Sequence, residues 1–224
     1  MDTKQKKIFL QEEADAWFER DRVAISKFDI ESDPVATIIK KYRIESTSCL
    51  EVGCSAGHRL NGLKSIFPHS KYYGIDPSTR AIHYGRNNFT SLDLSIGTVD
   101  DLSIYDTGQF DLIILGFLFY VLDRSLLLKA VAEIDRVLKN EGFIVLVDFQ
   151  AVKPVRVKYH HITQFEAFSY KQSYENIFTS SCLYHLLEKN TLIHNMDNHF
   201  DSSSDFKNQY SVTLLKKNIH VAYE

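Results

Sequence analysis

Short apolar runs alternate with amphipathic stretches through the middle of the chain. The amphipathic stretches repeat their apolar residues three and four positions apart, as helices on a core do, and the apolar runs have the length of buried strands. The predicted strands cover residues 48–52, 72–75, 93–96, 110–115 and 142–149, and the predicted helices cover residues 57–67, 77–88 and 124–138. This alternation predicts an α/β fold, in which a parallel sheet carries helices on both faces.

Two further regions flank this alternating core. Helical periodicity runs from about residue 8 to residue 42, where Asp33 and Pro34 have the residue types of a helix N-cap and first turn. At the other end, two β-like runs, 184–194 and 210–216, enclose a polar segment at 197–205. That pattern is typical of an antiparallel hairpin with an exposed loop. His194 falls in the first of the two runs and is expected to be an ordinary strand residue.

The segment between the core and the hairpin differs in composition. Residues 151–183 are rich in Tyr, His and Phe and contain one predicted short helix, at about 171–178. We expect this segment to shape a substrate site. Because no repeat or linker is visible, we expect one domain with four parts: an N-terminal helical lid (1–45), a core (48–150), the insertion (151–183) and a C-terminal hairpin (184–224).

The composition narrows the class of protein. With 224 residues, 44% of them hydrophobic, the chain can fill one sizeable core. Its net charge of −3 comes from 29 acidic and 26 basic residues without a phosphate-binding basic stripe, so we expect no nucleic-acid partner. No apolar run reaches the roughly 18 residues of a membrane span, and the start lacks the apolar stretch of a signal peptide. We therefore expect a cytoplasmic protein without a membrane partner, whose oligomeric state the sequence does not determine.

Cysteine and acidic residues give no sign of a metal centre. Cys49, Cys54 and Cys182 form no CxxC pair, the spacing that would indicate a zinc or redox site. Asp148, in the last core strand, has no cluster of companion ligands nearby in the sequence. We predict reduced cysteines and no metal.

The first predicted strand ends in a turn of small residues, Gly53, Ser55 and Gly57. In an open parallel sheet, ligands bind outside the carboxyl ends of the strands, and the first strand-to-helix turn must let them approach the backbone closely. A glycine after a strand is also a common turn requirement, so the turn by itself is a weak sign of a ligand.

An acidic residue, Asp76, ends the second predicted strand. An acid at this place can accept both hydroxyl groups of a ribose. The spacing of the glycine turn does not fit the G-x-G-x-x-G pattern of dinucleotide-binding proteins, so NAD and FAD are disfavoured.

These elements together resemble the class I S-adenosylmethionine (SAM)-dependent methyltransferases, which carry an acidic-x-G-x-G-x-G turn, an acid ending strand two and an aspartate-led strand four. The chain shows this order over residues 48–150 as Glu51-x-Gly53-x-Ser55-x-Gly57, Asp76, Gly97 to Leu102, Phe110 to Ile114, and Arg136 to Phe143. The resemblance implies a Rossmann-like α/β fold: a seven-stranded, mostly parallel sheet with a C-terminal antiparallel hairpin strand. It also implies methyl transfer, with SAM as cofactor and S-adenosylhomocysteine (SAH) as product.

The resemblance further implies which residues bind the methyl donor, with two departures from the family pattern. Ser55 replaces the middle glycine, which is tolerable if its φ is negative, and its hydroxyl can contact the methionine end of SAM. Thr98 stands where many relatives carry an aspartate for the adenine amino group, so Asp100 or a carbonyl near Val99 is the alternative. The implied donor-binding residues are Glu51, Gly53, Ser55, Gly57, Asp76, Pro77, Thr98, Val99, Asp100, Gly116 and Phe117.

Three residues are candidates for catalytic roles. Tyr120, in the aromatic run after the fourth strand, can face the sulfonium of the donor, because a cation is attracted to aromatic faces and oxygen lone pairs. His160 and His161 are the candidate general bases, since the unperturbed pKa of histidine, about 6.5, is close to working pH. Two alternatives stay open. The aromatic run can pack in the core, and His160 and His161 can be exposed surface residues with no catalytic role.

Other aromatic and basic residues are candidates for binding the acceptor. Trp17 and Arg20 belong to a possible lid, in which Arg20 would hold a carboxylate; an amphipathic helix with solvated arginines is the alternative. The ammonium group of Lys171 can bind phosphate or carboxylate, and the phenol groups of the tyrosines can donate hydrogen bonds. The alternative for Lys171 is a solvated lysine on a short helix. The candidate substrate-binding residues are Trp17, Arg20, Tyr159, Tyr170, Lys171 and Tyr174.

Methyl transfer is an in-line displacement at carbon, so the protein mainly aligns donor and acceptor in a dry site. We predict transfer to an oxygen or nitrogen of a small polar metabolite, a class that includes anionic and sugar-like molecules. Two alternatives stay open: a SAM-binding protein without catalysis, such as a regulatory or scaffold subunit, because fold alone does not fix function, and an RNA methyltransferase.

Overall fold

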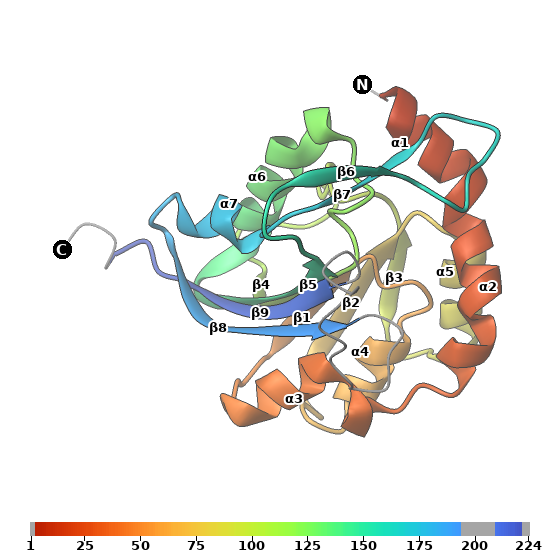
Figure 1. The fold of residues 1–224 in the computed structure, drawn as a ribbon. Helices are drawn as coiled ribbons and strands as arrows, with labels where there is room; N and C mark the ends of the chain where they lie inside the picture. The colour runs from red at the N-terminus through yellow and green to blue at the C-terminus, as the bar shows by residue number, and fades with distance from the viewer. Residues whose placement is uncertain (1–2, 194–208, 221–224) are drawn as a thin grey trace.

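A seven-stranded sheet in the order β3-β2-β1-β4-β5-β9-β8 forms the centre of the computed structural model, which describes residues 3–193 and 209–220 (Figure 1). Strands β1 to β5 pair in parallel, and β9 is antiparallel to both of its neighbours. The predicted mostly parallel sheet with an antiparallel C-terminal hairpin strand is confirmed. The strands are β1 (Ser48–Val52), β2 (Lys71–Asp76), β3 (Asp93–Ile96), β4 (Phe110–Gly116), β5 (Leu138–Phe149), β8 (Tyr184–Ile193) and β9 (Gln209–Lys217). The polar loop predicted at 197–205 and His194 lie outside the described residues.

Helices cover both faces of the sheet, as predicted. Successive side chains of a strand point to opposite faces, so Leu112 and Ile114 of β4 join one core cluster while Ile113 and Leu115 join the other. The first cluster includes side chains of α3 (Pro34–Lys41), α4 (His58–Leu63) and α5 (Thr79–Asn88), and the second includes side chains of α6 (Leu127–Val137) and α7 (Glu175–Thr179). Burial on both faces explains why the central strands are apolar without alternation.

The chain enters the fold through a series of short helices. Helix α1 (Lys4–Ile8) continues through a π-helical turn, η1 (Phe9–Glu13), into α2 (Ala14–Ser26), and a 3-10 turn, η2 (Ile30–Ser32), precedes α3. Figure 1 shows α2 beside α5, and α1 near the end of the hairpin of β6 (Val155–Lys158) and β7 (Phe168–Lys171). The predicted cap of α3 is present, because Asp33 Oδ1 accepts hydrogen bonds from the backbone N–H groups of Val35 (2.8 Å) and Ala36 (3.1 Å).

The insertion differs from its prediction. It contains an antiparallel hairpin of β6 (Val155–Lys158) and β7 (Phe168–Lys171), where the sequence predicted only a short helix at 171–178. The helix is the shorter α7, and Lys171 ends β7 instead of lying on a helix. Every residue of β6 is exposed, so the strand has no buried face. The short alternation of apolar and polar residues from Val155 to Lys158 was a strand signal that the prediction missed.

Element boundaries around α6 also differ slightly from the prediction. The helix predicted at 124–138 begins with a separate 3-10 turn, η3 (Arg124–Leu126), and β5 follows α6 directly at Leu138. Asn140 and Glu141, which lie between the predicted helix and the predicted strand, belong to a shift of register between β4 and β5, with Glu141 at φ 64°.

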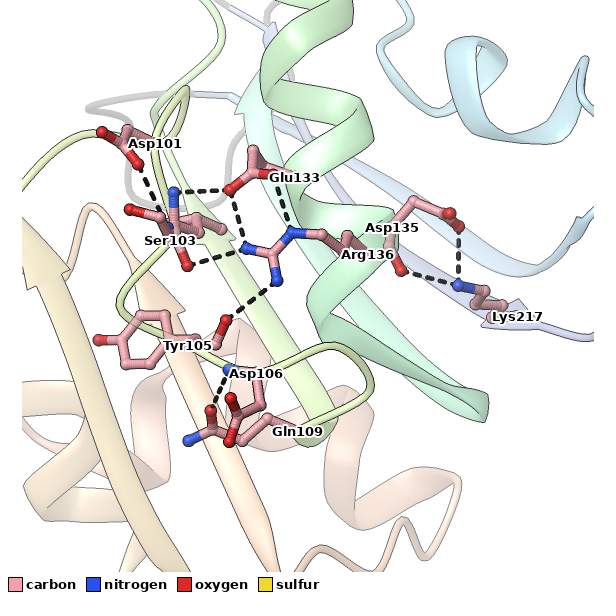
Figure 2. Close-up of polar contacts among 10 residues, drawn as sticks. Asp101, Ser103, Tyr105, Asp106, Gln109, Glu133, Asp135, Arg136 and Lys217 are labelled. Atoms are coloured by element: carbon pink, nitrogen blue, oxygen red, sulfur yellow. Dashed lines mark hydrogen bonds and ion pairs between the residues drawn. The ribbon is translucent and has the colours of Figure 1, made fainter.

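Arg136 of α6 holds the loop between β3 and β4 in place (Figure 2). Its guanidinium donates to the backbone carbonyls of Leu102 (2.9 Å) and Tyr105 (3.0 Å). Glu133 pairs with Arg136 (2.9 Å) and accepts from the Leu102 N–H (2.8 Å). These contacts hold the loop beside the carboxyl end of β3 against the helix.

Within residues 3–193 and 209–220, none of the helices combines the length and apolar character that a membrane span requires.

Candidate active site

A cleft lies at the carboxyl ends of β1, β2 and β4, under the N-terminal helices. It consists of a cavity of about 360 Å³ and an adjoining slot of about 90 Å³, which share residues such as Gly53 and Pro77 in their walls. A separate hollow of about 510 Å³ near α7 contains none of the predicted site residues. The cavity brings together the predicted residues Trp17, Glu51, Gly53, Ser55, Asp76, Pro77, Gly116, Phe117, Tyr120 and Tyr159, and the slot adds Thr98, Val99 and Asp100.

The turn after β1 has a left-handed backbone at three positions. Gly53 and Gly57 both have φ of 78°, and a Cβ on Gly53 would lie 3.2 Å from the Gly116 carbonyl oxygen. Ser55 has φ of 50°, so the condition under which a serine would be tolerable in place of the glycine, a negative φ, is not met. The turn is closed by a hydrogen bond from the Gly57 N–H to the Cys54 carbonyl (2.8 Å), and this closure imposes the left-handed conformation on a serine. The Ser55 hydroxyl is buried and has no hydrogen-bond partner among the described residues.

Asp76 connects this turn to the end of β2. Its Oδ2 accepts from the Ser55 N–H (2.8 Å) and its Oδ1 from the Ser78 N–H (2.8 Å). Burial raises the pKa of Asp76 to about 6, although the two backbone hydrogen bonds lower it. Each carboxylate oxygen has a second lone pair, so Asp76 can accept further hydrogen bonds from a ligand in the cavity.

A buried charge network borders the same cavity. Arg59 of α4 pairs with Glu51 Oε1 and donates from Nε to Asp33 Oδ2 (3.0 Å). Burial raises the pKa of Glu51 to about 7, against the opposing effect of Arg59. The other oxygen of Glu51, Oε2, is buried without a hydrogen-bond partner among the described residues. An unpaired buried carboxylate oxygen is costly, and it suits a cationic donor from a ligand.

We did not predict Arg59 or its neighbour His58 from the sequence. Both line the cavity, and burial lowers the pKa of His58 to about 4, which keeps its imidazole neutral. The sequence did contain a signal for them. His58 and Arg59 directly follow the glycine turn and begin a helix with a buried face, so they lie near the ligand side of the turn.

The slot has a charged end. Both oxygens of Asp100 accept from the Lys6 ammonium at 2.9 Å. Burial raises the pKa of Asp100, but hydrogen bonds from Lys6 and Thr98 outweigh burial and lower it overall. If Asp100 binds an amino group of a ligand, it must share its oxygens with Lys6.

Asp148 positions the aromatic segment that follows β4. It is buried, and its Oδ2 accepts from the N–H groups of Leu118 (3.1 Å) and Phe119 (2.7 Å). Burial raises the pKa of Asp148 to about 7. Phe117 has φ of 48°, and its ring lies against that of Tyr120, with centroids 6.5 Å apart. The structure therefore gives Asp148 a positioning role that its sequence neighbours did not indicate.

The far wall of the cavity contains a polar cluster from three elements. The Tyr159 hydroxyl donates to Glu13 Oε1 (2.6 Å), and Arg20 forms an ion pair with the same carboxylate. Arg20, expected to hold a carboxylate of a ligand, is thus engaged by a carboxylate of the protein. Glu13 was not predicted from the sequence. The only indication of a role was that this acidic residue falls on the apolar side of the predicted N-terminal helix, the side of Trp17.

The remaining acceptor-side candidates lie outside the cavity. His160 and His161 are exposed in the connection between β6 and β7, with their rings 5.7 and 5.5 Å from that of Tyr159. The base hypothesis for these histidines stays a prediction. Lys171 lies over the ring of Phe149 at 4.8 Å.

Tyr170 and Tyr174 belong to the surroundings of Arg124. The Arg124 guanidinium lies 4.3 Å from the Tyr170 ring centroid, and the Tyr174 hydroxyl donates to the Tyr170 carbonyl (2.7 Å). Tyr174 is completely buried beside Phe119, so the structure makes it a core residue instead of a binding residue.

Asp111, the aspartate that leads the fourth strand, has a structural role. Its carboxylate accepts from the hydroxyls of Ser46 and Thr47 (both 2.6 Å) and from the Ser48 N–H (3.2 Å). These contacts hold the start of β1 at the amino end of the sheet, opposite the cleft.

In the part of the chain that the structure describes, no group of three or more His, Cys, Asp and Glu side chains has a metal-binding arrangement. Cys49 and Cys54 are buried free thiols and Cys182 is exposed. The absence of a metal stays a prediction.

Comparisons with known proteins identify a methyltransferase domain and fold. Residues 50–146 match the family model described as a methyltransferase domain. A SAM-dependent methyltransferase of Methanosarcina mazei superposes with a TM-score of 0.65 at 16% identity, covering 82% of this chain and 98% of its own. A SAM-dependent methyltransferase of Clostridium acetobutylicum gives a TM-score of 0.60 at 14% identity, covering 91% and 98%.

A third similar structure contains ligands. The 1,6-didemethyltoxoflavin-N1-methyltransferase of Burkholderia thailandensis, with bound 1,6-didemethyltoxoflavin and SAH, gives a TM-score of 0.68 at 9% identity, covering 97% of this chain and 92% of its own. The comparison with curated protein sequences found no significant match. The methyltransferase domain matched over residues 50–146 and the strand order of the sheet, which is that of the class I methyltransferase fold, indicate a SAM-dependent methyltransferase, an enzyme that uses SAM as methyl donor.

Proposed function

We propose that this enzyme methylates an oxygen or nitrogen atom of a small-molecule acceptor, and that the acceptor binds in the cavity under the N-terminal helices. The observation that carries the proposal is that one cavity is lined by the donor-type residues of β1 and β2 on one side and by Trp17, Tyr120 and Tyr159 on the other. Donor and acceptor can therefore meet at near-attack distance in a space from which the helices exclude water.

The residues present fit SAM. Left-handed Gly53 and Gly57 leave the backbone of the turn open to close approach, and Asp76 has lone pairs for the ribose hydroxyls. The unpaired oxygen of Glu51 suits the ammonium of the methionine end, and the unpaired Ser55 hydroxyl can donate to its carboxylate. When bound, SAM supplies a methyl group on a positively charged sulfur.

The adenine of SAM fits the slot beside this cavity. Thr98, Val99 and Asp100 border the slot, and Gly53 and Pro77 connect it to the main cavity. Phe117 and Tyr120 place aromatic faces in the cavity wall, where a cationic sulfur is attracted to them.

The N-terminal helices act as a closed lid. Gln5 donates to the carbonyls of Val121 (3.0 Å) and Phe168 (3.2 Å), and Asp15 accepts from the Ser78 hydroxyl (2.7 Å). These contacts fasten the lid on both sides of the cleft, an arrangement that suits a small acceptor better than a nucleic-acid strand. A cytoplasmic location without a nucleic-acid partner is part of the same proposal.

The proposal is tested by measuring SAH formation from SAM with pools of phenols, N-heterocycles, amines, hydroxy acids and sugars, and separately with total RNA. We expect SAH above the acceptor-free rate with at least one small-molecule pool and none with RNA. Calorimetric binding of SAM without product in every pool would overturn the proposal in favour of a non-catalytic binder. Product with RNA alone would identify an RNA methyltransferase instead.

A further inference from the structure

Glu13 lies at an unusual place in the lid. It ends the π-helical turn η1, which separates α1 from α2, and it is 6% exposed. π-Helical turns are rare and occur often at functional sites, because the extra residue re-aims the side chains around it. Here the turn brings Phe9 and Glu13 into the wall of one cavity, so a carboxylate lies inside a largely apolar lid.

The hydrogen bonds leading away from Glu13 have a defined direction. A tyrosine hydroxyl has one proton, and that of Tyr159 is donated to Glu13 at 2.6 Å. Tyr120 lies next to Tyr159, with ring centroids 6.4 Å apart, and a hydrogen bond between the two hydroxyls must run from Tyr120 to Tyr159, because the Tyr159 proton is donated to Glu13. The oxygen of Tyr120 then has lone pairs but no proton left for a ligand. A methyl acceptor that contacts Tyr120 must therefore donate an O–H or N–H to it.

The two phenols stay protonated in this cluster. Burial raises the pKa of both Tyr120 and Tyr159. Arg20 forms an ion pair with Glu13, whose carboxylate is the terminal hydrogen-bond acceptor of the cluster.

The charges of the cavity wall oppose an anionic acceptor. The charged side chains in the wall are the carboxylates of Glu13, Glu51 and Asp76 and the guanidinium of Arg59. Arg59 is already paired with Glu51 and with Asp33 outside the wall, so it does not attract a further anion strongly. With the paired residues behind the wall included, Arg20 beside Glu13 and Asp33 beside Arg59, four carboxylates face two guanidinium groups. SAM carries a net charge of about +1 and does not reverse this excess of negative charge.

Aromatic side chains form much of the rest of the wall. Phe9, Trp17, Phe117, Tyr120 and Tyr159 all line the cavity. Aromatic faces and edges bind flat rings in stacked or edge-on contacts, so a ring-bearing acceptor fits this wall better than a sugar.

We propose that Tyr120, Tyr159 and Glu13 form a proton relay on the acceptor wall, and that the acceptor is an uncharged, ring-bearing molecule whose methylated atom carries an O–H or N–H. In this step the X–H bond of the acceptor breaks as the X–CH₃ bond forms, and the S–CH₃ bond breaks with its electron pair staying on sulfur. The acceptor proton passes to the Tyr120 oxygen, the Tyr120 proton to Tyr159, and the Tyr159 proton to Glu13. This inference rests on the proposed function and narrows its substrate class.

The test uses two probes of the same shape, 4-hydroxybenzamide and 4-hydroxybenzoate, which differ in charge. Each is titrated by calorimetry into the SAH-saturated full-length protein. We expect the wild type to bind the uncharged amide at least about tenfold more tightly than the benzoate, because like charges in a low-dielectric site repel strongly. In Glu13→Gln this ratio should fall below about threefold, since the variant keeps the shape and removes the charge.

Glu12→Gln is the matched control, because Glu12 neighbours Glu13 but does not line the cavity. SAH formation from the amide should fall at least about tenfold in Glu13→Gln and in Tyr159→Phe. Affinity for SAH should stay near that of the wild type in every variant. Unchanged SAH affinity shows that these variants fold, so a loss of turnover is then assigned to the relay.

Three results would overturn the inference: equal or tighter binding of the benzoate by the wild type, an unchanged binding ratio in Glu13→Gln, or no binding of either probe to SAH-loaded protein. The binding ratio needs no turnover, so it tests the inference separately from the proposed function. A wild type that binds SAH and shows the expected ratio, but transfers methyl to no acceptor, contradicts the proposed function alone.

Discussion

The backbone N–H of Ser55 donates a hydrogen bond of 2.8 Å to Oδ2 of Asp76. This bond joins the turn after β1 to the end of β2, the two places where the donor-type residues of the family occur. Asp76 therefore has two tasks in the proposed site. It stabilises a left-handed turn, and it offers its remaining lone pairs to the ribose of SAM.

Asp76→Asn should weaken SAH binding at least about tenfold. An asparagine side chain has one oxygen and one NH₂ group, so it accepts hydrogen bonds at one position instead of two, and it loses the charge that strengthens those bonds. Calorimetric titration with SAH measures the effect. Asp101→Asn is the matched control, since Asp101 is an exposed carboxylate outside the cleft. Equal affinity in wild type and Asp76→Asn would contradict the ribose assignment.

Ser55→Gly and Ser55→Ala separate the backbone of the turn from its hydroxyl. Both variants lack the Ser55 hydroxyl, and only glycine adopts a φ of 50° without strain. We expect Ser55→Gly to be more stable than Ser55→Ala by about 1 kcal/mol, or about 2–4 °C in Tm. Thermal unfolding of the two variants measures it, and identical Tm values would show that the turn stores no strain.

The stability of the ligand-free enzyme should depend on pH through Glu51. Its pKa is raised to about 7 by burial, so between its ordinary value of 4.5 and about 7 the folded protein binds a proton that the unfolded chain has released. The stabilisation that this extra proton gives the folded protein is fully present below pH 4.5 and is lost as pH rises through about 7. Asp76 and Asp148 act in the same direction, and His58, whose pKa is lowered, acts in the opposite one.

Glu51→Gln isolates this contribution. Urea unfolding at about pH 5 and pH 8 should show a larger loss of unfolding free energy in the wild type than in the variant. Saturating SAH should reduce the difference, because its ammonium can pair with the ionised carboxylate. Parallel pH dependence in the two proteins would contradict the raised pKa of Glu51.

The histidine pair and the tyrosine relay make opposite predictions about the general base. With 4-hydroxybenzamide as acceptor, we expect the double variant His160→Ala/His161→Ala to keep SAH formation within about twofold of the wild type, since neither histidine lines the cavity. Glu13→Gln should lose most of it. If the double histidine variant lost activity with unchanged SAH affinity and Glu13→Gln did not, the histidine hypothesis would hold instead.

The sequence by itself determined the layered fold and predicted the residues of the proposed donor side of the site. Helix and strand periodicities are local properties of a chain, so the order of strands and helices from 48 to 149 was readable. The donor turn and Asp76 follow directly after their strands, and the carboxyl ends of neighbouring parallel strands meet at one edge of the sheet.

Only the tertiary structure decided the acceptor side. Glu13 and Tyr159 are 146 positions apart, and no local pattern connects a lid helix to an insertion. His160 and Tyr174 were both predicted to lie beside the acceptor, but His160 is exposed and Tyr174 is buried in the core. The burial and direction of such side chains depend on tertiary packing, which a local sequence pattern does not show. The left-handed φ of Ser55 likewise follows from closure of the turn by the hydrogen bond between Gly57 and Cys54, which residue type alone does not reveal.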